Sequence, residues 1–288
     1  MQSSTLRTMF RFSTVLRDVS KTPIRSMSSS GSKLTTVDVN DKSGVAVLTM
    51  NRPPVNGLNL DLLREIHNSI DEIESNKCRG LILTSASNSV FSAGLDIMEM
   101  YKPDQQRLKQ FWTTLQDTWL ALYGSGVPTA AAINGHSPAG GCLLATSCEY
   151  RVMLPNFTIG LNETRLGIVA PKWFMSTFCN VLPRRVAEMA LTQGKMFSSE
   201  EALKSGLVDE LAQTKEEALA KCEKFIASFA KTNPFARSMT KQQFRAKDLQ
   251  QLEDEKKQDL DAFVFFVNQP SVQKGLGAYL ESLKAKSK

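Results

Sequence analysis

Two hydrophobic periodicities follow one another along this chain, the short alternation of strands and the three-to-four spacing of helices. Residues 34–39 and 44–50 are β-rich with partial alternation, and the polar run 40–43 between them predicts a hairpin. After Asn59, a suitable helix cap, apolar residues at 62, 63, 66, 70 and 73 predict a helix. Further expected elements are a buried strand at 79–84, a helix at 105–123, and strands at 149–153 and 157–160.

Residues 130–147 pass from a small apolar strand through a glycine-bearing turn into the start of an apolar helix. The strand breaks at Asn134-Gly135, and Gly140-Gly141 precede the helical segment 142–145. The first N–H groups of a helix lack intrahelical partners, and the helix dipole adds positive charge there. Such a turn can hold a phosphate or the oxyanion of a reacting carbonyl. The same glycines also suit close packing of helix on strand, so this passage alone leaves both interpretations open.

A second glycine turn, at residues 91–97, follows the predicted strand at 79–84. Neither turn continues as a phosphate-binding Gly-Lys-Ser/Thr loop or as a dinucleotide-binding Gly-x-Gly-x-x-Gly fingerprint. Two such turns aimed at one atom would instead form an oxyanion hole from backbone donors alone. Repeated strand–turn–helix units with buried strands predict an α/β fold with a parallel core.

The chain after Pro171 has a mostly helical pattern, and from Asn233 onwards it predicts only helices. The segment 263–267 (Phe-Val-Phe-Phe-Val) is more apolar than a lone helix exposes to water. We therefore expect the C-terminal helices to pack on the core or on another subunit.

The first 33 residues carry six basic side chains and one acid among many Ser and Thr residues, with an apolar side. This composition predicts a mitochondrial transit peptide and a location in the mitochondrial matrix; a basic disordered tail is the alternative. The segment also holds five of the six net positive charges, which leaves about one for the rest. That balance argues against a nucleic-acid partner. No run of 18 apolar residues predicts an integral membrane segment.

The five cysteines are widely spaced without a Cys-x-x-Cys pair, which predicts reduced and mostly buried thiols. Only two histidines are present, so we expect no metal site. His67 falls on the surface of a predicted helix, and His136 is expected to shape the glycine turn.

Glu163 is the candidate acid–base group, since its loop contains mostly apolar or small residues. Partial burial would raise the pKa of this carboxyl toward the range of a general base. Capping of a neighbouring turn, or an ion pair with Arg165, is the structural alternative.

Four blocks of the sequence resemble, in order, the enoyl-CoA hydratase/isomerase (crotonase) superfamily. The resemblance extends from about residue 34 to the C-terminus. The blocks are Asn51-Arg-Pro-Pro-Val-Asn-Gly-Leu-Asn59, Phe91-Ser-Ala-Gly-Leu-Asp-Ile-Met-Glu-Met100, Ala132-Ile-Asn-Gly-His-Ser-Pro-Ala-Gly-Gly-Cys142 and Gly160-Leu-Asn-Glu-Thr-Arg-Leu-Gly-Ile168.

The resemblance implies a crotonase-type spiral of β-β-α units over residues 34–230 and a helical region at 231–288 that builds homotrimers, sometimes paired into hexamers. It implies an acyl-CoA substrate whose thioester oxygen lies on the N–H groups of Leu95 and Gly140. Coenzyme A is then part of the substrate, and no separate cofactor is expected. The implied substrate-binding residues are Ala93, Gly94, Leu95, Asp96, Ile97 and Gly140.

Hydratases of this family use two glutamates to activate water, and the resemblance places the later one at Glu163. The earlier one falls on Leu143, three residues past Gly140. One remaining base matches the family's isomerases, which move a 3-cis or 3-trans double bond to 2-trans during β-oxidation. The alternatives are a dienoyl-CoA isomerase, a hydratase, an acyl-CoA hydrolase, an RNA-binding relative, and a scaffold without activity.

Overall fold

The computed structural model describes residues 33–286, so the predicted transit peptide lies outside the described residues apart from Lys33. The strands are β1 (Thr35–Val39), β2 (Val45–Met50), β3 (Gly80–Ser85), β4 (Thr129–Ile133), β5 (Ser137–Pro138), β6 (Tyr150–Met153), β7 (Thr158–Gly160), β8 (Phe197–Ser198) and β9 (Glu210–Leu211). The helices are α1 (Leu60–Ser75), α2 (Gln105–Tyr123), α3 (Gly140–Ser147), α4 (Lys172–Cys179), α5 (Arg184–Gln193), α6 (Ser199–Ser205), α7 (Lys215–Ala227), α8 (Pro234–Val267) and α9 (Pro270–Lys286). Two short 3₁₀ helices, η1 (Ile97–Glu99) and η2 (Glu163–Leu166), lie in loops.

The main sheet has six strands in the order β1-β2-β3-β4-β6-β9. β1 and β2 form the predicted antiparallel hairpin, whereas the remaining pairs are parallel. α1 connects β2 to β3, and α2 connects β3 to β4. The predicted parallel α/β core is confirmed.

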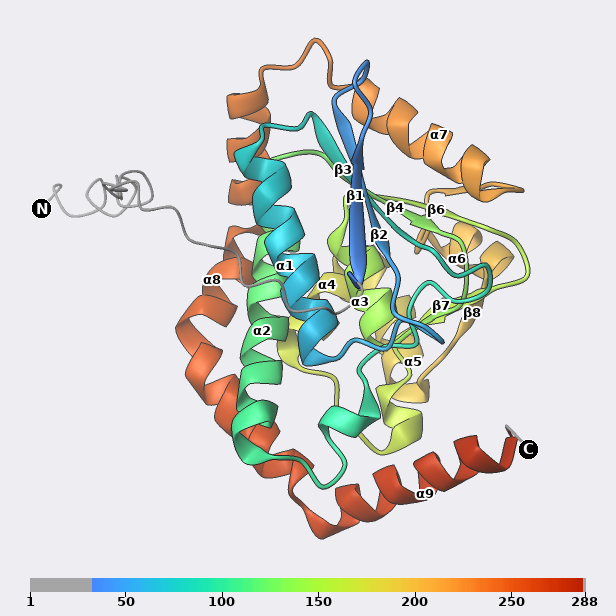
Figure 1. Cartoon of the computed structure of the whole chain (residues 1–288), viewed down its shortest axis with the longest axis vertical. Coiled ribbons are helices and arrows are strands. Elements are labelled where there is room, and N and C mark those ends of the chain that lie inside the picture. Colours follow the sequence, from blue (N-terminus) through green and yellow to red (C-terminus); the bar gives the residue numbers. More distant parts are fainter. Residues whose placement is uncertain (1–32, 287–288) are drawn as a thin grey trace, which may run out of the picture. The chain divides into compact units, whose positions relative to one another are not determined.

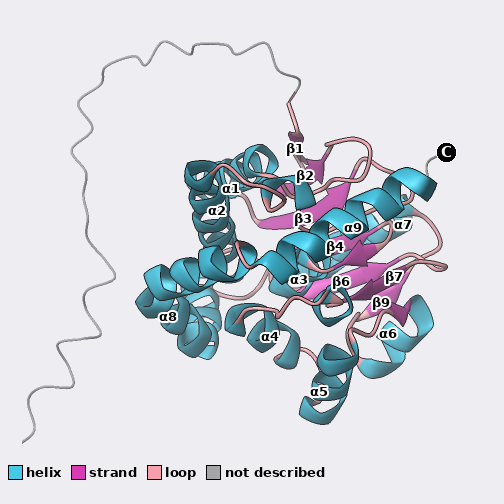
Figure 2. Cartoon of the chain, turned by 90° about the horizontal axis from the view of Figure 1, so that it is seen from below, coloured by secondary structure: helices cyan, strands magenta, loops and turns pink. Residues whose placement is uncertain are grey.

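Helices cover both faces of this sheet (Figure 1). α1 and α2 pack against each other on one face, and α7 packs on the other against β3, β4 and β6. Figure 2 shows the strands between these two helix layers. In β3, Leu81 and Leu83 enter the larger core with α1 and α2, while Ile82 enters the smaller core with α7. Side chains of a strand alternate between its two faces, which explains this division.

A second sheet of three short strands, β5-β7-β8, brings two distant loops together. Ser137 pairs with Ile159, and Pro138 with Gly160, in parallel register. The Ala139 N–H then donates to the Gly160 carbonyl at 2.9 Å. The segments leading into α3 and into Glu163 are therefore adjacent by backbone pairing.

The C-terminal helices pack on the core, as the sequence predicts. Asn233 caps α8, and its side chain accepts a hydrogen bond from the Ala236 N–H. Phe263 of α8 stacks on Trp112 of α2 with ring centroids 3.6 Å apart. Phe235, Phe244 and Phe265 of α8 stay largely exposed. None of the helices within residues 33–286 has the length and apolar character needed to cross a membrane.

Candidate active site

The two glycine turns follow the carboxyl ends of the neighbouring strands β3 and β4. The side chain of Asn134 joins these ends, since its amide nitrogen donates to the carbonyls of Ser85 at 3.0 Å and Ser87 at 2.8 Å. Its oxygen accepts from the Ser85 N–H at 3.2 Å. The next residue must be glycine, because a Cβ on Gly135 would lie 2.3 Å from the Val90 nitrogen. The two turns are thus fixed to one another.

Leu95 and Gly140 present their backbone amides side by side. A Cβ built on Gly140 would lie 3.4 Å from the Leu95 nitrogen, so the two chain segments nearly touch. Gly140 is the first residue of α3, and Ala139 before it has a φ of +48°. Among the residues that the structure describes, neither of the two N–H groups has a hydrogen-bond acceptor. Two free donors at one place can stabilise a single oxyanion.

Glu163 is buried, with a relative exposure of 8%. Its Oε2 atom has no hydrogen-bond partner within residues 33–286. Burial raises the pKa of the carboxyl to about 7, and the hydrogen bond from its own backbone N–H offsets only part of this increase. The structure does not support an ion pair with Arg165, because that exposed side chain donates its Nε to the Gln193 carbonyl. A buried carboxyl with a pKa near neutrality can both take up and release a proton.

The carboxyl of Glu163 lies close enough to the first turn of α3 to act on the Cys142 thiol. Burial raises the pKa of this thiol first, and the charge of Glu163 raises it further. Leu143, the next residue, is fully buried in the larger core. This turn therefore presents a buried aliphatic side chain three residues after Gly140.

The other predicted site residues lie on the same loop as Leu95. Gly94 has a φ of +86° and is buried, and Asp96 caps η1 by accepting from the Met98 N–H. Ala93 is exposed and Ile97 is half-buried. The structure thus gathers this loop, Gly140 and Glu163 around the start of α3.

The histidines and cysteines have structural surroundings. The His136 ring makes a 3.0 Å hydrogen bond with the Thr158 hydroxyl, and its backbone carbonyl accepts from Phe91, as expected for a residue that shapes the turn. All five cysteines are free thiols, and three of them are buried. Residues 33–286 contain no group of three or more His, Cys, Asp or Glu side chains that could hold a metal ion.

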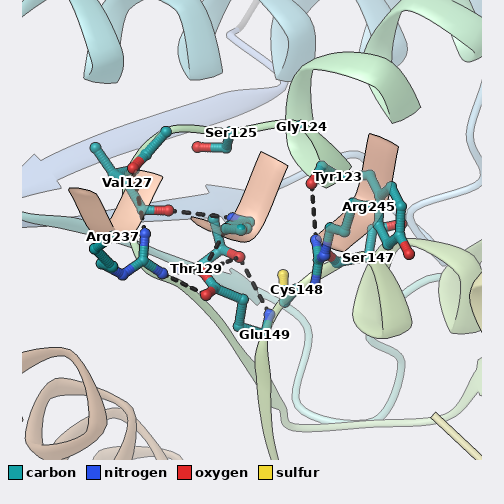
Figure 3. A network of polar contacts seen from close by, with 12 residues as sticks. Tyr123, Gly124, Ser125, Val127, Thr129, Ser147, Cys148, Glu149, Arg237 and Arg245 are labelled. Atoms are coloured by element: carbon teal, nitrogen blue, oxygen red, sulfur yellow. Dashed lines mark hydrogen bonds and ion pairs between the residues drawn. The ribbon is translucent and has the colours of Figure 1, made fainter. Parts of the chain in front are cut away.

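A second polar cluster, which the sequence did not predict, lies at the amino ends of β4 and β6 (Figure 3). Glu149 forms ion pairs with Arg237 and with Lys241 of α8, the latter at 2.9 Å. Burial lowers the pKa of Lys241 to about 8. Arg245 donates from one nitrogen to the Tyr123 carbonyl at 2.8 Å and to the Ser147 carbonyl at 2.9 Å. Figure 3 shows this guanidinium between the C-terminal ends of α2 and α3, where Tyr123 and Ser147 lie.

These side chains line a cavity of about 680 Å³, which contains none of the predicted site residues. All four of the charged side chains just described have partners within the cluster. The cluster therefore attaches α8 to the core rather than adding to the glycine-turn site.

Residues 40–288 match the sequence profile of the family described as enoyl-CoA hydratase/isomerase. The chain belongs to this family.

Individual members of the enoyl-CoA hydratase/isomerase family are similar over most of the chain. The mouse protein "Enoyl-CoA delta isomerase 1, mitochondrial" is 42% identical over 253 residues, which cover 87% of each chain. Its human counterpart is 40% identical over 257 residues, covering 88% of this chain and 85% of that one. The crystal structure of human mitochondrial delta3-delta2-enoyl-CoA isomerase superposes with a TM-score of 0.86 at 39% identity, covering 89% of this chain and 100% of that chain. The expected crotonase-type fold with C-terminal helices is confirmed.

Proposed function

We propose that this protein is an enoyl-CoA delta isomerase, which moves the double bond of 3-cis- or 3-trans-enoyl-CoA to the 2-trans position. The observation that carries the proposal is the buried Glu163 carboxyl, with its pKa raised to about 7 and one oxygen free of partners. The adjacent N–H groups of Leu95 and Gly140 support it, because isomerisation through an enolate needs both a base and an oxyanion hole.

Substrate binding places the thioester oxygen on the N–H groups of Leu95 and Gly140. These donors polarise the carbonyl and make the C2 protons more acidic. Their interaction strengthens as negative charge develops on the oxygen, so they stabilise the transition state more than the bound substrate.

Glu163 then removes a proton from C2, and the electron pair of that C–H bond passes into a dienolate. The protonated Glu163 returns the same proton at C4, and the double bond then lies between C2 and C3. A carboxyl whose pKa lies near neutrality suits this two-way transfer, because its ionised form is basic enough to accept the proton and its protonated form is acidic enough to return it. The reaction needs no metal ion or separate cofactor, since the acyl-CoA carries the reacting group.

The decisive assay uses purified protein with 3-cis- and 3-trans-enoyl-CoA of several chain lengths. Formation of the conjugated 2-trans thioester is followed by its ultraviolet absorbance. We expect turnover of both isomers, and a protein that binds these substrates without converting them contradicts the proposal.

Leu143 leads us to expect poor hydration of 2-trans-enoyl-CoA. Hydration requires a positioned and activated water, and an aliphatic side chain buried at this position supplies neither a base nor a hydrogen-bond acceptor. Hydration of crotonyl-CoA should therefore have a kcat at least about a hundredfold below that of isomerisation. Comparable rates for the two reactions would favour a hydratase.

The pH dependence should follow the ionisation of Glu163. Only the ionised carboxylate can accept the C2 proton, so kcat/KM should fall about tenfold per pH unit below about 7 and become constant above it. Initial isomerisation rates at low substrate concentration, measured between about pH 5.5 and 8.5, test this expectation. A profile that stays flat down to pH 5.5 would assign the proton transfer to a group with an ordinary carboxyl pKa.

We also propose a mitochondrial matrix location and a homotrimer or hexamer. The names of the mouse and human relatives support the former. The exposed phenylalanines of α8 support the latter, because aromatic side chains of this size commonly lie in subunit interfaces.

A further inference from the structure

The block Asn51–Asn59 resembles the family but has no part in the proposed proton transfer. Arg52, from this block, lies beside the loop that carries Leu95. Its Nη2 atom is 2.8 Å from Asp96 Oδ2, and its Nη1 atom donates to the Gly57 carbonyl at 2.8 Å. A single guanidinium thus joins the two chain segments that meet at this loop.

These segments also meet through their backbones at an isolated parallel bridge between Leu58 and Leu95. The Leu58 N–H donates to the Gly94 carbonyl at 2.8 Å, and the Asp96 N–H donates to the Leu58 carbonyl at 3.0 Å. In a parallel bridge of this kind Leu58 makes both of its backbone hydrogen bonds with the two neighbours of Leu95, and none with Leu95 itself. The Leu95 amide therefore points away from the bridge and remains free. Its direction depends on how firmly the bridge is held.

The Arg52 segment is itself fixed to the core. The Asn56 side chain accepts from the Arg52 N–H at 2.7 Å and donates to the Ser85 hydroxyl at 2.7 Å and the Phe91 carbonyl at 3.1 Å. Asn56 is buried, with 3% exposure. Arg52 is therefore fixed in place where it contacts the loop that carries Gly94 and Leu95.

Asp96 transmits this support to the loop. Its Oδ2 atom forms the ion pair with Arg52, and its Oδ1 atom accepts a hydrogen bond from the Met98 N–H at 3.0 Å. Both carboxylate oxygens are thus engaged by the protein. The side chains of the pair are 27% and 17% exposed, so water screens the charges only in part.

We propose that the Arg52–Asp96 pair is a positioning pair, which holds the Leu95 N–H in the direction that an oxyanion requires. This inference rests on the proposed function and deepens it. Neither residue takes part in proton transfer. Loss of the pair leaves the Leu95 amide in place but free to tilt, and a small misalignment weakens the transition state more than the bound substrate.

The test compares Arg52→Gln, Asp96→Asn and the double variant with the control Arg185→Gln. Arg185 forms an exposed ion pair with Glu188 on α5, so the control removes an arginine–carboxylate pair elsewhere. We expect each single variant to lower kcat for 3-enoyl-CoA about ten- to fiftyfold, with KM changed less than about threefold. The double variant should be no slower than the singles, because both remove the same interaction. The control should keep wild-type kinetics.

A second measurement separates positioning from folding and from the proposed reaction. A bound 3-oxoacyl-CoA ionises to an enolate with its own ultraviolet absorbance, and an aligned oxyanion hole lowers the pKa of that ionisation. We expect the apparent pKa of bound acetoacetyl-CoA to be about one unit higher in the pair variants than in wild type, which corresponds to a tenfold loss of enolate stabilisation.

A lowered melting temperature with unchanged kcat and unchanged enolate pKa overturns the inference and leaves a merely structural ion pair. Losses that multiply in the double variant overturn it as well. A wild-type protein that lowers the enolate pKa but does not isomerise 3-enoyl-CoA contradicts the proposed function alone, and the enolate titration then still tests the pair. A wild-type protein that does neither overturns both.

Discussion

Glu163→Gln should lower kcat for isomerisation of 3-enoyl-CoA by about a thousandfold or more, while acyl-CoA binding persists. Glutamine keeps the size of the side chain, but it cannot accept the C2 proton. Steady-state kinetics give the loss of turnover, and calorimetric titration with a saturated acyl-CoA gives the affinity. The matched control is Glu188→Gln, the same substitution at an exposed position on α5.

The same variant should change the pH dependence of stability. The pKa of Glu163 rises from 4.5 to about 7 on folding. Between these pH values the native state keeps a proton that the unfolded state has lost, so the wild-type free energy of unfolding falls as pH rises through this window, by up to about 3 kcal/mol. Glutamine removes this fall. Wild-type turnover by Glu163→Gln would remove Glu163 from the proposed mechanism, and an unchanged pH dependence of its melting temperature would contradict the raised pKa of this carboxyl.

Gly94→Ala should lower kcat by about a hundredfold, because it disturbs the contact between the two glycine turns. A Cβ at this position would lie 2.9 Å from the Ala139 Cβ and 3.2 Å from the Gly140 nitrogen. The backbone must shift to relieve these contacts, and the shift moves one proposed oxyanion donor relative to the other. Steady-state kinetics with 3-enoyl-CoA measure the effect.

Gly206→Ala is the matched control for the strain that a left-handed backbone imposes on alanine. Gly206 has a φ of +83°, close to the +86° of Gly94, but a Cβ there would meet nothing within 4 Å. Both variants should lose about 1 kcal/mol of stability from the backbone conformation. Only the Gly94 variant should lose activity, and equal kcat values for the two would show that the Gly94–Gly140 contact does not matter for catalysis.

The sequence predicted the elements whose signals are local. The hairpin, the Asn59-capped α1 and the full extent of α2 match the structure, because each has a clear periodicity or cap over several residues. β8 and β9 were not predicted within the mostly helical region after Pro171. Strands of two residues carry no periodicity, and their existence depends on the sheet edges they complete.

The candidate site likewise combines features that local sequence signals predict with features that depend on contacts between distant segments. The glycine turns and Glu163 could be selected from residue type, spacing and family resemblance. The raised pKa of Glu163 results from burial by segments distant in sequence, and the pairing of Arg52 with Asp96 spans 44 positions. The ion pairs of Glu149 with α8 span about 90 positions. Contacts of this range depend on the completed fold and leave no pattern along the chain.

The position of Arg245 late in the chain affects the order in which parts of the protein fold. Its side chain supplies the hydrogen bond for the last carbonyl of α3, the helix whose first amide is the proposed oxyanion donor, although the two residues are 98 positions apart. A nascent chain therefore contains every reacting group long before it contains this bond. Until α8 docks, the Tyr123 and Ser147 carbonyls lack the hydrogen bonds from Arg245 that satisfy them in the folded protein. The proposed catalytic centre should therefore reach its final geometry only once α8 has docked on the core.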